Sequence, residues 1–456
     1  MPIEEKDLKT ILDDISYLIA ARQEASVKAM LLSLRSEDIA QLINHLKNKE
    51  ERLYVFKLLD TESASEVIME LDEVVREQLV DHLGMRELAE LVDEMDSDDA
   101  ADFVSELDEE VVDEVLENVE EEDREEVRQL LEHEEDTAGG IMALEIIAVN
   151  QSWTVDQVIQ EIRRKADEVD DVYNVYVVDD EGKLVGFVTV KDLIIASGNT
   201  IVKTIMDRDV LSVPVTMDQE QVANFAKKYD LVSVPVVDAD NRLLGRITID
   251  DIVDVMFEEA TEDIQKMAGL SDDEDVRQTS VFRIVRGRLP WLITGLMGGI
   301  FAAFVMASYE TSLRLEMTLL FFVPVVLGMG GNVGIQSSAI VVRGLATGEI
   351  SGKDIFRRLL KEMKVSLMNG LILGLVIFTV VSFGFRESSL KVGFLISSAL
   401  MTVMLMAGIV GSTVPLILKK MNIDPALATG PFITTSNDII GLYIYLAMAT
   451  FFLKTL

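Results

Sequence analysis

The stretch YVVDDEGKLVGFVTVKDLI, residues 176–194, returns 59 residues later as PVVDADNRLLGRITIDDIV, residues 235–253. Seven of the 19 aligned positions are identical, including a Gly, a Thr and an Asp of each copy. Each copy is typical of a β-strand, a polar turn, a second strand and the start of a helix, and a helical stretch precedes each. The repetition indicates an internal duplication of one supersecondary unit, so we expect an α/β module with two copies.

The two copies resemble a tandem pair of CBS (cystathionine-β-synthase-type) domains, whose signature is a V-V-D…G-h-h-T-x-x-D stretch. CBS pairs are regulatory modules, and the resemblance implies that an adenosine nucleotide such as ATP can bind. In such sites the Thr and Asp of the signature hold the ribose, which here implies Thr189 with Asp192, or Thr248 with Asp251. The other interpretation is that both copies are purely structural. Leu231 stands where an aromatic side chain could stack on adenine, and this departure weakens the expectation for ATP.

Charge is distributed unevenly along the 456 residues. Residues 1–280 hold 72 of the 80 acidic side chains and 26 of the 41 basic ones, a net charge of −46, whereas residues 281–456 carry +7. Binding of nucleic acid needs Lys and Arg to displace counterions, so we expect no nucleic acid as a partner. Divalent cations or a basic protein suit such a surface, although a solvated acidic surface that aids solubility explains it equally well. The chain has no Cys, which excludes thiolate metal sites and disulfides.

Residues 1–135 favour helices throughout. LGMRELAELVDEM (83–95) and DAADFVSELDEEVVDEVLENV (99–119) both place apolar residues at helical spacing. No strict repeat period is evident, so we expect a superhelix or bundle of short helices. Paired glycines in EEDTAGGIM (134–142) end this region. The N-terminus, MPIEEKDLKT, has no apolar core, so no cleaved signal peptide is expected.

Five long, charge-poor runs follow residue 280. Each exceeds the roughly 20 apolar residues that a bilayer core requires, so five membrane spans and contact with membrane lipid are predicted. In the second run, VPVVLGMGGNVGIQSS (323–338) favours a kinked or locally unwound helix. An odd number of spans makes a closed pore within one chain less natural, so we expect a homodimer with ten spans. The predicted spans are Leu289–Tyr309, Met317–Val342, Val365–Phe385, Gly393–Leu418 and Pro425–Leu453.

Basic residues gather in the loops on one side of these spans if the spans alternate in direction. The opposite loops hold only Arg314, Arg386 and Lys391. The basic side faces the cytoplasm, which predicts a multi-pass protein of the cell (inner) membrane with a cytoplasmic N-terminus and an extracytoplasmic C-terminus. The basic-side residues are Arg283, Arg286, Arg288, Arg343, Lys353, Arg357, Arg358, Lys361, Lys364, Lys419 and Lys420.

PFITTSNDIIG, residues 431–441, places a single carboxylate, Asp438, inside the last apolar run. A lipid-facing carboxylate would cost about 2.5–3.5 kcal/mol, so this one must face protein or water. Its position 14 residues after Asp424 predicts a depth of roughly 21 Å from the cytoplasmic end if the helix is continuous. Two interpretations follow, namely a site for a hydrated divalent cation, or a buried pair with Asn332 or Gln336 of the second span.

An acidic helix follows the second copy of the duplicated unit. TIDDIVDVMFEEATEDIQKM (248–267) places carboxylates four residues apart along one face, and its first basic residue is Lys266. Like charges at this spacing destabilise an isolated helix by about 0.2–0.5 kcal/mol per pair. Hard divalent ions prefer carboxylate oxygens, so a cation beside this face is one interpretation and a solvated acidic face is the other. DEMDSDDAAD (93–102) repeats the theme in the N-terminal region.

The whole chain resembles the MgtE family of magnesium channels. Four separated stretches carry the resemblance in the right order: EEDTAGGIM, EEATEDI (258–264), VPVVLGMGGNVGIQSS and DPALATGPFITTSNDIIG (424–441). It implies a multidomain fold with an all-α, superhelical N domain, an α/β tandem CBS pair and an α-helical membrane domain of five transmembrane helices. The implied boundaries are 1–135 for the acidic N domain, 136–256 for the CBS pair, 257–287 for the acidic connecting (plug) helix and 288–456 for the pore domain.

The resemblance also implies the sites. A homodimer would carry the ion path on its axis, lined by the second and fifth spans, and cytoplasmic Mg²⁺ bound between N domain, CBS pair and plug helix would hold the path closed. The implied pore residues are Asp438, Ala428, Thr435 and Asn332. The implied ligands of regulatory Mg²⁺ are Glu66, Asp98, Asp102, Asp218, Glu220, Asp230, Asp251, Asp254, Glu259, Glu262, Asp263 and Asp424.

Charge and resemblance together predict a Mg²⁺-selective channel for magnesium uptake under negative feedback from cytoplasmic Mg²⁺. Two other classes stay open: a secondary transporter of Mg²⁺, Co²⁺ or Mn²⁺, and a membrane-anchored metal or nucleotide sensor that conducts nothing. Spacing does not decide between Mg²⁺ and Co²⁺, Mn²⁺ or Ca²⁺, because the pore width sets this selectivity.

No catalytic residues are expected. His45, His82 and His133 all lie in the helical region and suit surface or packing roles. GEISGKD (348–354) is too short between its glycines and ends in Asp, so it fails as a phosphate-binding loop. We therefore expect a protein that is not an enzyme.

Overall fold

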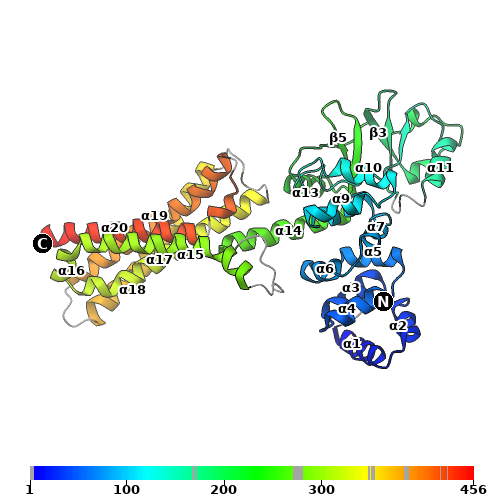
Figure 1. The fold of residues 1–456 in the computed structure, drawn as a ribbon. Helices are drawn as coiled ribbons and strands as arrows, with labels where there is room; N and C mark the ends of the chain where they lie inside the picture. The colour runs from blue at the N-terminus through cyan, green and yellow to red at the C-terminus, as the bar shows by residue number, and fades with distance from the viewer. Residues whose placement is uncertain are drawn as a thin grey trace. The chain divides into compact units, whose positions relative to one another are not determined.

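The computed structural model describes residues 5–455 except 167–168, 170–171, 271–280, 348–349, 351–354, 385–389, 422 and 429. It forms two compact units, Met1–Phe257 and Glu258–Leu456 (Figure 1). The boundary between them falls inside helix α14 (Ile249–Ala268).

The first unit begins with ten short helices. α4, α6, α8 and α10 begin at residues 49, 73, 97 and 121, a constant interval of 24 residues. α3 contacts α5, α5 contacts α7 and α7 contacts α9, so successive helix pairs stack as in a superhelix. The expected superhelix is confirmed, but the view that no strict repeat exists is wrong. The helices are α1 (Glu5–Ala20), α2 (Glu24–Leu31), α3 (Ser36–His45), α4 (Lys49–Phe56), α5 (Thr61–Met69), α6 (Glu73–Val80), α7 (Met85–Val92), α8 (Ser97–Ser105), α9 (Glu109–Leu116) and α10 (Glu121–Leu130).

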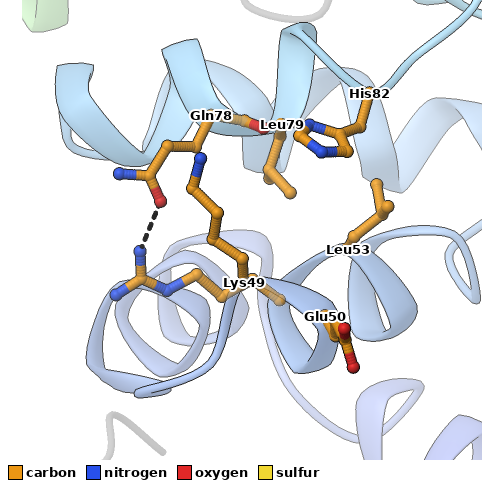
Figure 2. A pocket seen from close by; sticks show the side chains of 7 residues that line it. Lys49, Glu50, Leu53, Gln78, Leu79 and His82 are labelled. Carbon is orange, nitrogen blue, oxygen red and sulfur yellow. Dashed lines mark hydrogen bonds between the residues drawn. The ribbon is translucent and has the colours of Figure 1, made fainter.

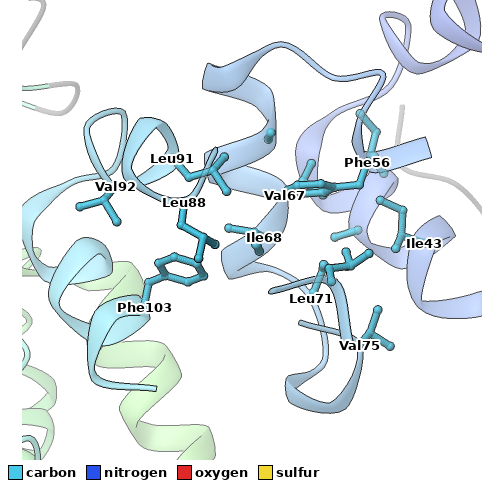
Figure 3. Packing of buried hydrophobic residues seen from close by; sticks show 14 of the residues in the cluster. Ile43, Phe56, Val67, Ile68, Leu71, Val75, Leu88, Leu91, Val92 and Phe103 are labelled. Atoms are coloured by element: carbon cyan, nitrogen blue, oxygen red, sulfur yellow. The ribbon is translucent and has the colours of Figure 1, made fainter. Parts of the chain in front are cut away.

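The repeat is visible in the buried apolar side chains. Ile43, Ile68, Val92 and Leu116 occupy the same place in four successive repeats and are all buried. Figure 3 shows the first three of them, with Phe103 of α8 packed beside Leu88. Because each repeat buries its apolar face only against its neighbours, stacking supplies the core that a single helix pair lacks.

A small pocket lies between α4 and α6 (Figure 2). Arg52 donates from Nη1 to Oε1 of Gln78 at 3.2 Å across it. His82 lies on its rim and bonds through Nδ1 to the backbone carbonyl of Gln78 at 3.0 Å. His45 makes the same kind of bond to Gln41 at 2.8 Å. Both imidazoles are exposed and bond to the backbone four residues earlier, which agrees with a surface role.

The duplicated unit folds as two three-stranded sheets of identical design. The first has the order β1-β2-β3 and the second the order β4-β5-β6, each with one parallel and one antiparallel pair. Both antiparallel pairs carry a register shift at the same place, Val177/Val178 in one and Val236/Val237 in the other. The predicted duplication is confirmed down to this irregularity. The elements are β1 (Ala148–Asn150), α11 (Val155–Arg164), β2 (Asn174–Val178), β3 (Leu184–Thr189), α12 (Val190–Ile195), η1 (Val202–Thr204), β4 (Val213–Pro214), α13 (Gln219–Tyr229), β5 (Ser233–Val237) and β6 (Leu243–Thr248).

The glycine-containing stretch after α10 joins the helical repeats to the second sheet. Ala138 N donates to Met217 O at 2.6 Å, and Ala143 pairs with Arg246 of β6. Ala101 of α8 and Leu130 of α10 share one buried cluster with this sheet. The helical repeats and the second CBS copy are thus packed together within one unit.

The second unit contains five helices long and apolar enough to cross a membrane, as predicted. α17 is a continuous helix of 29 residues through Pro324 and its glycines, so the alternative of an unwound segment is wrong. The elements are α15 (Val281–Ser308), α16 (Glu310–Leu315), α17 (Thr318–Ala346), α18 (Ile355–Gly384), α19 (Leu390–Lys420), the 3₁₀ turn η2 (Pro425–Ala428) and α20 (Gly430–Thr455).

α17, α19 and α20 form the centre of this unit, with α18 against α19 and α15 against α20 (Figure 1). Close approach depends on small residues, as expected for helices packing in lipid. A Cβ on Gly411 of α19 would collide with the backbone carbonyl of Gly334 in α17. Gly441 of α20 lies against Val403 of α19 and Leu327 of α17.

The last span starts later than predicted. Residues 425–428 form η2, and α20 begins at Gly430, whose φ of +49° lies in the left-handed region. Asp438 is therefore only eight residues, or about 12 Å, into α20 rather than roughly 21 Å along one helix. The carboxylate therefore lies in the N-terminal half of this 26-residue helix, one to two turns before its centre.

Candidate functional site

Asp438 lies half-buried on α20. In the described part of the chain it forms no hydrogen bond or ion pair. The pairing with Asn332 or Gln336 that the sequence left open is therefore absent within the protomer. A half-buried carboxylate with its oxygens uncommitted is suited to accept water molecules or a hydrated cation.

Its neighbour Asn437 faces into the protein. Asn437 is 3% exposed and lies against Gly334 of α17, and its Nδ2 has no hydrogen-bond partner among the described residues. Thr434 donates its hydroxyl to the carbonyls of Gly430 and Pro431, both at 3.1 Å. The side of α20 that holds Asn437 is thus fixed by packing, and Asp438 lies about 100° around the helix from it.

Thr435 and Ala428 were the other residues predicted on this part of the path. The methyl group of Thr435 lies against Gly298 of α15. The backbone of Ala428 belongs to η2, and its side chain lies outside the described residues.

α17 presents a polar stripe on its exposed side. Asn332 and Gln336 are exposed and lie one turn apart, in line with Gly328. Another side of α17 is buried against α19 and α20, and its exposed side continues beyond the two amides with apolar residues such as Val325 and Ile340. Two amides facing lipid would be unfavourable, because hydrocarbon offers them no hydrogen-bond partner. This stripe therefore needs water or a second protein surface beside it.

The end of α14 and the start of α20 meet in a joint formed by residues 266–269, 424–428, 430 and 431. The Nζ of Lys266 lies 2.8 Å from Oδ2 of Asp424 and also bonds to Glu262. Gly269 has φ +74° and lies against the ring of Pro431. Lys266 thus supplies the positive charge between two of the predicted Mg²⁺ ligands.

The joint shifts the protonation of its charged groups. Loss of hydration, followed by the charge of Asp424, raises the pKa of Asp263. Burial alone would lower the pKa of Lys266, but its bonds to Asp424 and Glu262 outweigh this effect and raise it. The ammonium is therefore held firmly in its charged form.

A second acidic cluster lies where α8 meets the start of α14. Asp98 is 8% exposed, and burial followed by the charge of Asp251 raises its pKa well above the usual value. Burial likewise raises the pKa of Asp251, although the N–H and hydroxyl of Thr248 donate to it. Asp99 stays solvent-accessible, yet loss of hydration and Asp251 raise its pKa to about 7. In the described part of the chain, no Lys or Arg forms an ion pair with these three carboxylates.

Three acidic residues of this region were not singled out by the sequence analysis. Glu145 accepts from the backbone N–H and the hydroxyl of Ser97 at 3.0 and 2.9 Å, at the start of α8. Glu126 of α10 faces it, and loss of hydration followed by the charge of Glu145 raises the pKa of Glu126 to about 7. Glu70 of the turn after α5 has its pKa raised by loss of hydration and then by Asp254. Glu66, a predicted Mg²⁺ ligand, accepts a hydrogen bond from the hydroxyl of Ser36.

The other predicted regulatory ligands are dispersed. Asp102 is exposed on α8, one turn after Asp98. Asp218 caps α13 by accepting from Gln221 N at 3.2 Å, and Glu220 follows in the first turn of that helix. Asp230 ends α13 in the left-handed conformation, at φ +53°. Glu259 is partly buried on α14. Among the described residues, no group of three or more His, Asp or Glu side chains is arranged to hold a metal ion directly.

The predicted ribose pair is engaged within its own copy. Thr189 donates to Oδ2 of Asp192 at 2.6 Å and accepts from its N–H at 3.2 Å, which caps α12. In the second copy the hydroxyl of Thr248 likewise donates to Oδ2 of Asp251, and the backbone N–H of Thr248 donates to the same oxygen at 3.0 Å. Both pairs therefore have a structural role in the protein as described, whether or not a nucleotide binds.

Three family models match this chain in succession. A model described as "MgtE intracellular N domain" matches residues 16–136, and CBS-domain models match residues 138–199 and 202–258. A model described as "Divalent cation transporter" matches residues 323–448. Together they follow the order of the elements described above.

Curated relatives carry the same combination. The chain is 37% identical to a magnesium transporter MgtE of Enterococcus faecalis over 322 residues, covering 71% of this chain and 70% of that protein. It is 36% identical to a magnesium transporter MgtE of Thermus thermophilus, covering 71% of each. The corresponding protein of Bacillus subtilis is 35% identical and covers 70% of each.

Two solved structures match the soluble region. One is the soluble part of a magnesium transporter, with 29% identity, a TM-score of 0.51, and coverage of 56% of this chain and 99% of that one. The other is the cytosolic domain of the Mg²⁺ channel MgtE in complex with ATP, with 34% identity, a TM-score of 0.50, and coverage of 53% and 99%. The sequence matches, the order of domains and the five apolar helices together establish that the chain is a multi-pass membrane protein of the MgtE family of divalent-cation transporters.

Proposed function

We propose that this protein is a Mg²⁺-selective channel for magnesium uptake. The observation that carries the proposal is Asp438, a half-buried carboxylate with uncommitted oxygens inside an apolar spanning helix. Mg²⁺ releases its water reluctantly, so a carboxylate that accepts from bound water suits it better than a cage of direct ligands. The names of the relatives, which are magnesium transporters, support the choice of ion.

The ion path requires a second copy of the chain. The exposed amides of Asn332 and Gln336 need a polar environment, and a twofold axis beside α17 and α20 would supply one. We therefore propose a homodimer in which two Asp438 side chains face one water-filled path. Two such charges repel each other until a divalent cation lies between them. Asp438, Asn332, Thr435 and Ala428 remain predictions for the lining of this path. The basic loops remain the basis for a cytoplasmic N-terminus.

Cytoplasmic Mg²⁺ is proposed to close the channel. Residues 1–280 carry a net charge of −46, and the cluster around Asp98 and Asp251 concentrates that charge in a partly buried place. Mg²⁺ bound to the acidic side chains of the N domain, the CBS pair and the plug helix would relieve the repulsion. A ligand shifts a conformational equilibrium only if it binds one state more tightly, so the closed state must bind Mg²⁺ better.

The CBS pair is proposed to bind ATP in addition. The cytosolic domain of a relative has been solved in complex with ATP, which supports this assignment. Thr189 and Asp192 remain the predicted ribose contacts, although each would have to give up part of its present bond to the other.

Reconstitution of the full chain in liposomes tests the proposal. We expect Mg²⁺ influx driven by the Mg²⁺ gradient and the membrane potential alone, and inhibition of this influx by millimolar Mg²⁺ on the face of the N domain. A requirement for a proton or sodium gradient would favour secondary transport instead. Absence of flux, with Mg²⁺ or ATP still binding, would favour a sensor.

Lys266 provides a separate prediction on gating. Mg²⁺ at Asp424 and Glu262 must displace the ammonium that now bonds to both. Because a partly exposed ion pair contributes about 1 kcal/mol, we expect Lys266→Gln to lower the half-inhibitory Mg²⁺ concentration about fivefold in the liposome assay. Lys203→Gln is the matched control, since Lys203 is exposed in η1. A half-inhibitory concentration that stays the same or rises would show that Lys266 does not compete with Mg²⁺.

A further inference from the structure

α18 buries one carboxylate that no proposed ion site uses. Glu362 is the only acidic residue of this 30-residue apolar helix, and it is 5% exposed. Arg358, one turn earlier, donates from Nη2 to Oε1 of Glu362 at 2.8 Å. A buried charge is stable only when such partners compensate it, so the ion pair with Arg358 is what allows Glu362 to be buried in its charged form.

The second oxygen of Glu362 reaches a different helix. Ser337 of α17 donates its hydroxyl to Oε2 of Glu362 at 3.1 Å, and Ser337 is itself 3% exposed. α18 packs mainly along α19, and α17 packs along α19 and α20. The carboxylate therefore ties α18 to α17 by a polar bond that their apolar packing does not provide.

Ser337 is adjacent to the polar stripe of α17. Gln336 precedes it, and Asn332 lies five residues earlier, so the two amides are rotated about 100° and 140° around the helix from Ser337. A bond anchored at Ser337 restricts rotation of α17 about its own axis. The direction in which Asn332 and Gln336 point is then set by Glu362, although Glu362 contacts neither.

We propose that Glu362 is a positioning residue for ion selectivity, which holds α17 through Ser337 so that its amide stripe faces the ion path. This inference rests on the proposed channel function. Arg358 in turn holds the carboxylate in place. A change at this anchor alters which ions pass more than it alters whether the protein folds.

The test measures Mg²⁺ and Ca²⁺ flux in liposomes, each normalised to folded protein. Ser337→Ala removes only the hydrogen bond between α17 and α18. Glu362→Gln leaves a single side-chain oxygen to accept the bonds that Ser337 and Arg358 now donate to two oxygens. We expect each variant to lower the Mg²⁺/Ca²⁺ flux ratio about fivefold, and the double variant to lower it no further than either single one. Ser337→Thr retains the hydroxyl and is expected to retain the wild-type ratio.

Ser412→Ala is the matched control, because Ser412 is equally buried at 1% exposure but bonds only within its own helix, to Gly408 O at 2.6 Å. An unchanged ratio in Ser337→Ala, or equal effects of Ser337→Ala and Ser412→Ala, would overturn the inference. Loss of selectivity in Ser337→Thr would do the same. If the wild-type protein transports no Mg²⁺ at all, the proposed channel function is refuted. If the wild type is selective and Ser337→Ala has the same flux ratio, only the proposed role of Glu362 is refuted.

Discussion

Asp438→Ala is expected to reduce Mg²⁺ flux by at least about 100-fold while the protein still folds and assembles. A carboxylate roughly 6 Å from a hydrated divalent ion contributes about 5 kcal/mol at an effective dielectric constant near 20, and less where water fills the path. Even half of this energy corresponds to a rate change of about 100-fold. Asp438 makes no structural bond in the described part of the chain, so its removal has little direct cost for folding.

Asp438→Asn distinguishes the effect of the negative charge on Mg²⁺ flux from the effect of the size of the side chain. The amide preserves the size of the side chain but carries no charge, so we expect it to lose nearly as much flux as the Ala variant. Glu310→Ala is the control, because Glu310 is an exposed acid of α16 that pairs only with Arg314 on its own helix. The measurements are liposome flux and growth rescue of a magnesium-uptake-deficient bacterium. Rescue by Asp438→Ala at the level of the wild type would refute the assignment of Asp438 to the ion path.

Much of the fold was predictable because it depends on local patterns. Span-length apolar runs and a duplicated strand–turn–strand unit are visible in any single sequence. The 24-residue repeat of the N domain is hard to see in the sequence because few positions keep the same residue; the buried positions Ile43, Ile68, Val92 and Leu116 share only their apolar character. A search restricted to buried apolar positions would have found it.

The sites were less predictable because they depend on distant contacts. α20 begins at Gly430, in a left-handed conformation, and not at Pro425 as predicted. Asp438 therefore lies fewer residues from the start of its helix than the sequence indicated. Lys266 was noted as the first base after an acidic face, but its bond to Asp424 spans 158 residues. Glu70, which the sequence did not single out, lies near Asp254, and this contact joins residues that are far apart in the sequence. The spacing of residues predicts which of them share a face of a helix, but not which turn of that face contacts another part of the chain.

Because of the acidic cluster at α8, we expect the folding stability to fall as the pH rises, whereas carboxylates that are paired or hydrogen-bonded in the folded state have the opposite effect. The pKa of Asp98 is raised by burial and then by Asp251, and that of Asp99 is raised to about 7. When the pKa of a carboxyl is higher in the folded state than in the unfolded state, the protonated group favours folding. This contribution to stability is fully present below the pKa of the unfolded state, near 4, and is lost as the pH rises through the pKa of the folded state. Without Mg²⁺, the cluster therefore weakens the Met1–Phe257 unit between about pH 4 and pH 7.

Replacing Asp98 and Asp99 by Asn removes this effect. One unit of pKa corresponds to about 1.4 kcal/mol, and solvent screens Asp99, so we expect the double variant to gain on the order of 2 kcal/mol over the wild type at pH 7.5. At pH 4 we expect no gain. Thermal and urea unfolding of a fragment covering the Met1–Phe257 unit measures the difference. Asp60→Asn is a control of opposite sign, because bonds from Ser63 lower the pKa of Asp60 and its replacement should destabilise α5 at pH 7.5.

Magnesium should have the same effect on the wild type as the substitutions. If Mg²⁺ binds the cluster, a concentration 100 times the dissociation constant stabilises the folded state by about 2.7 kcal/mol. We therefore expect millimolar Mg²⁺ to raise the unfolding midpoint of the wild type at pH 7.5, and to raise that of the Asp98→Asn, Asp99→Asn variant much less. Equal Mg²⁺ stabilisation of both proteins would place the regulatory ion elsewhere. Because the same carboxylates repel one another without metal, the instability of this cluster at neutral pH is what would make closure depend on cytoplasmic Mg²⁺.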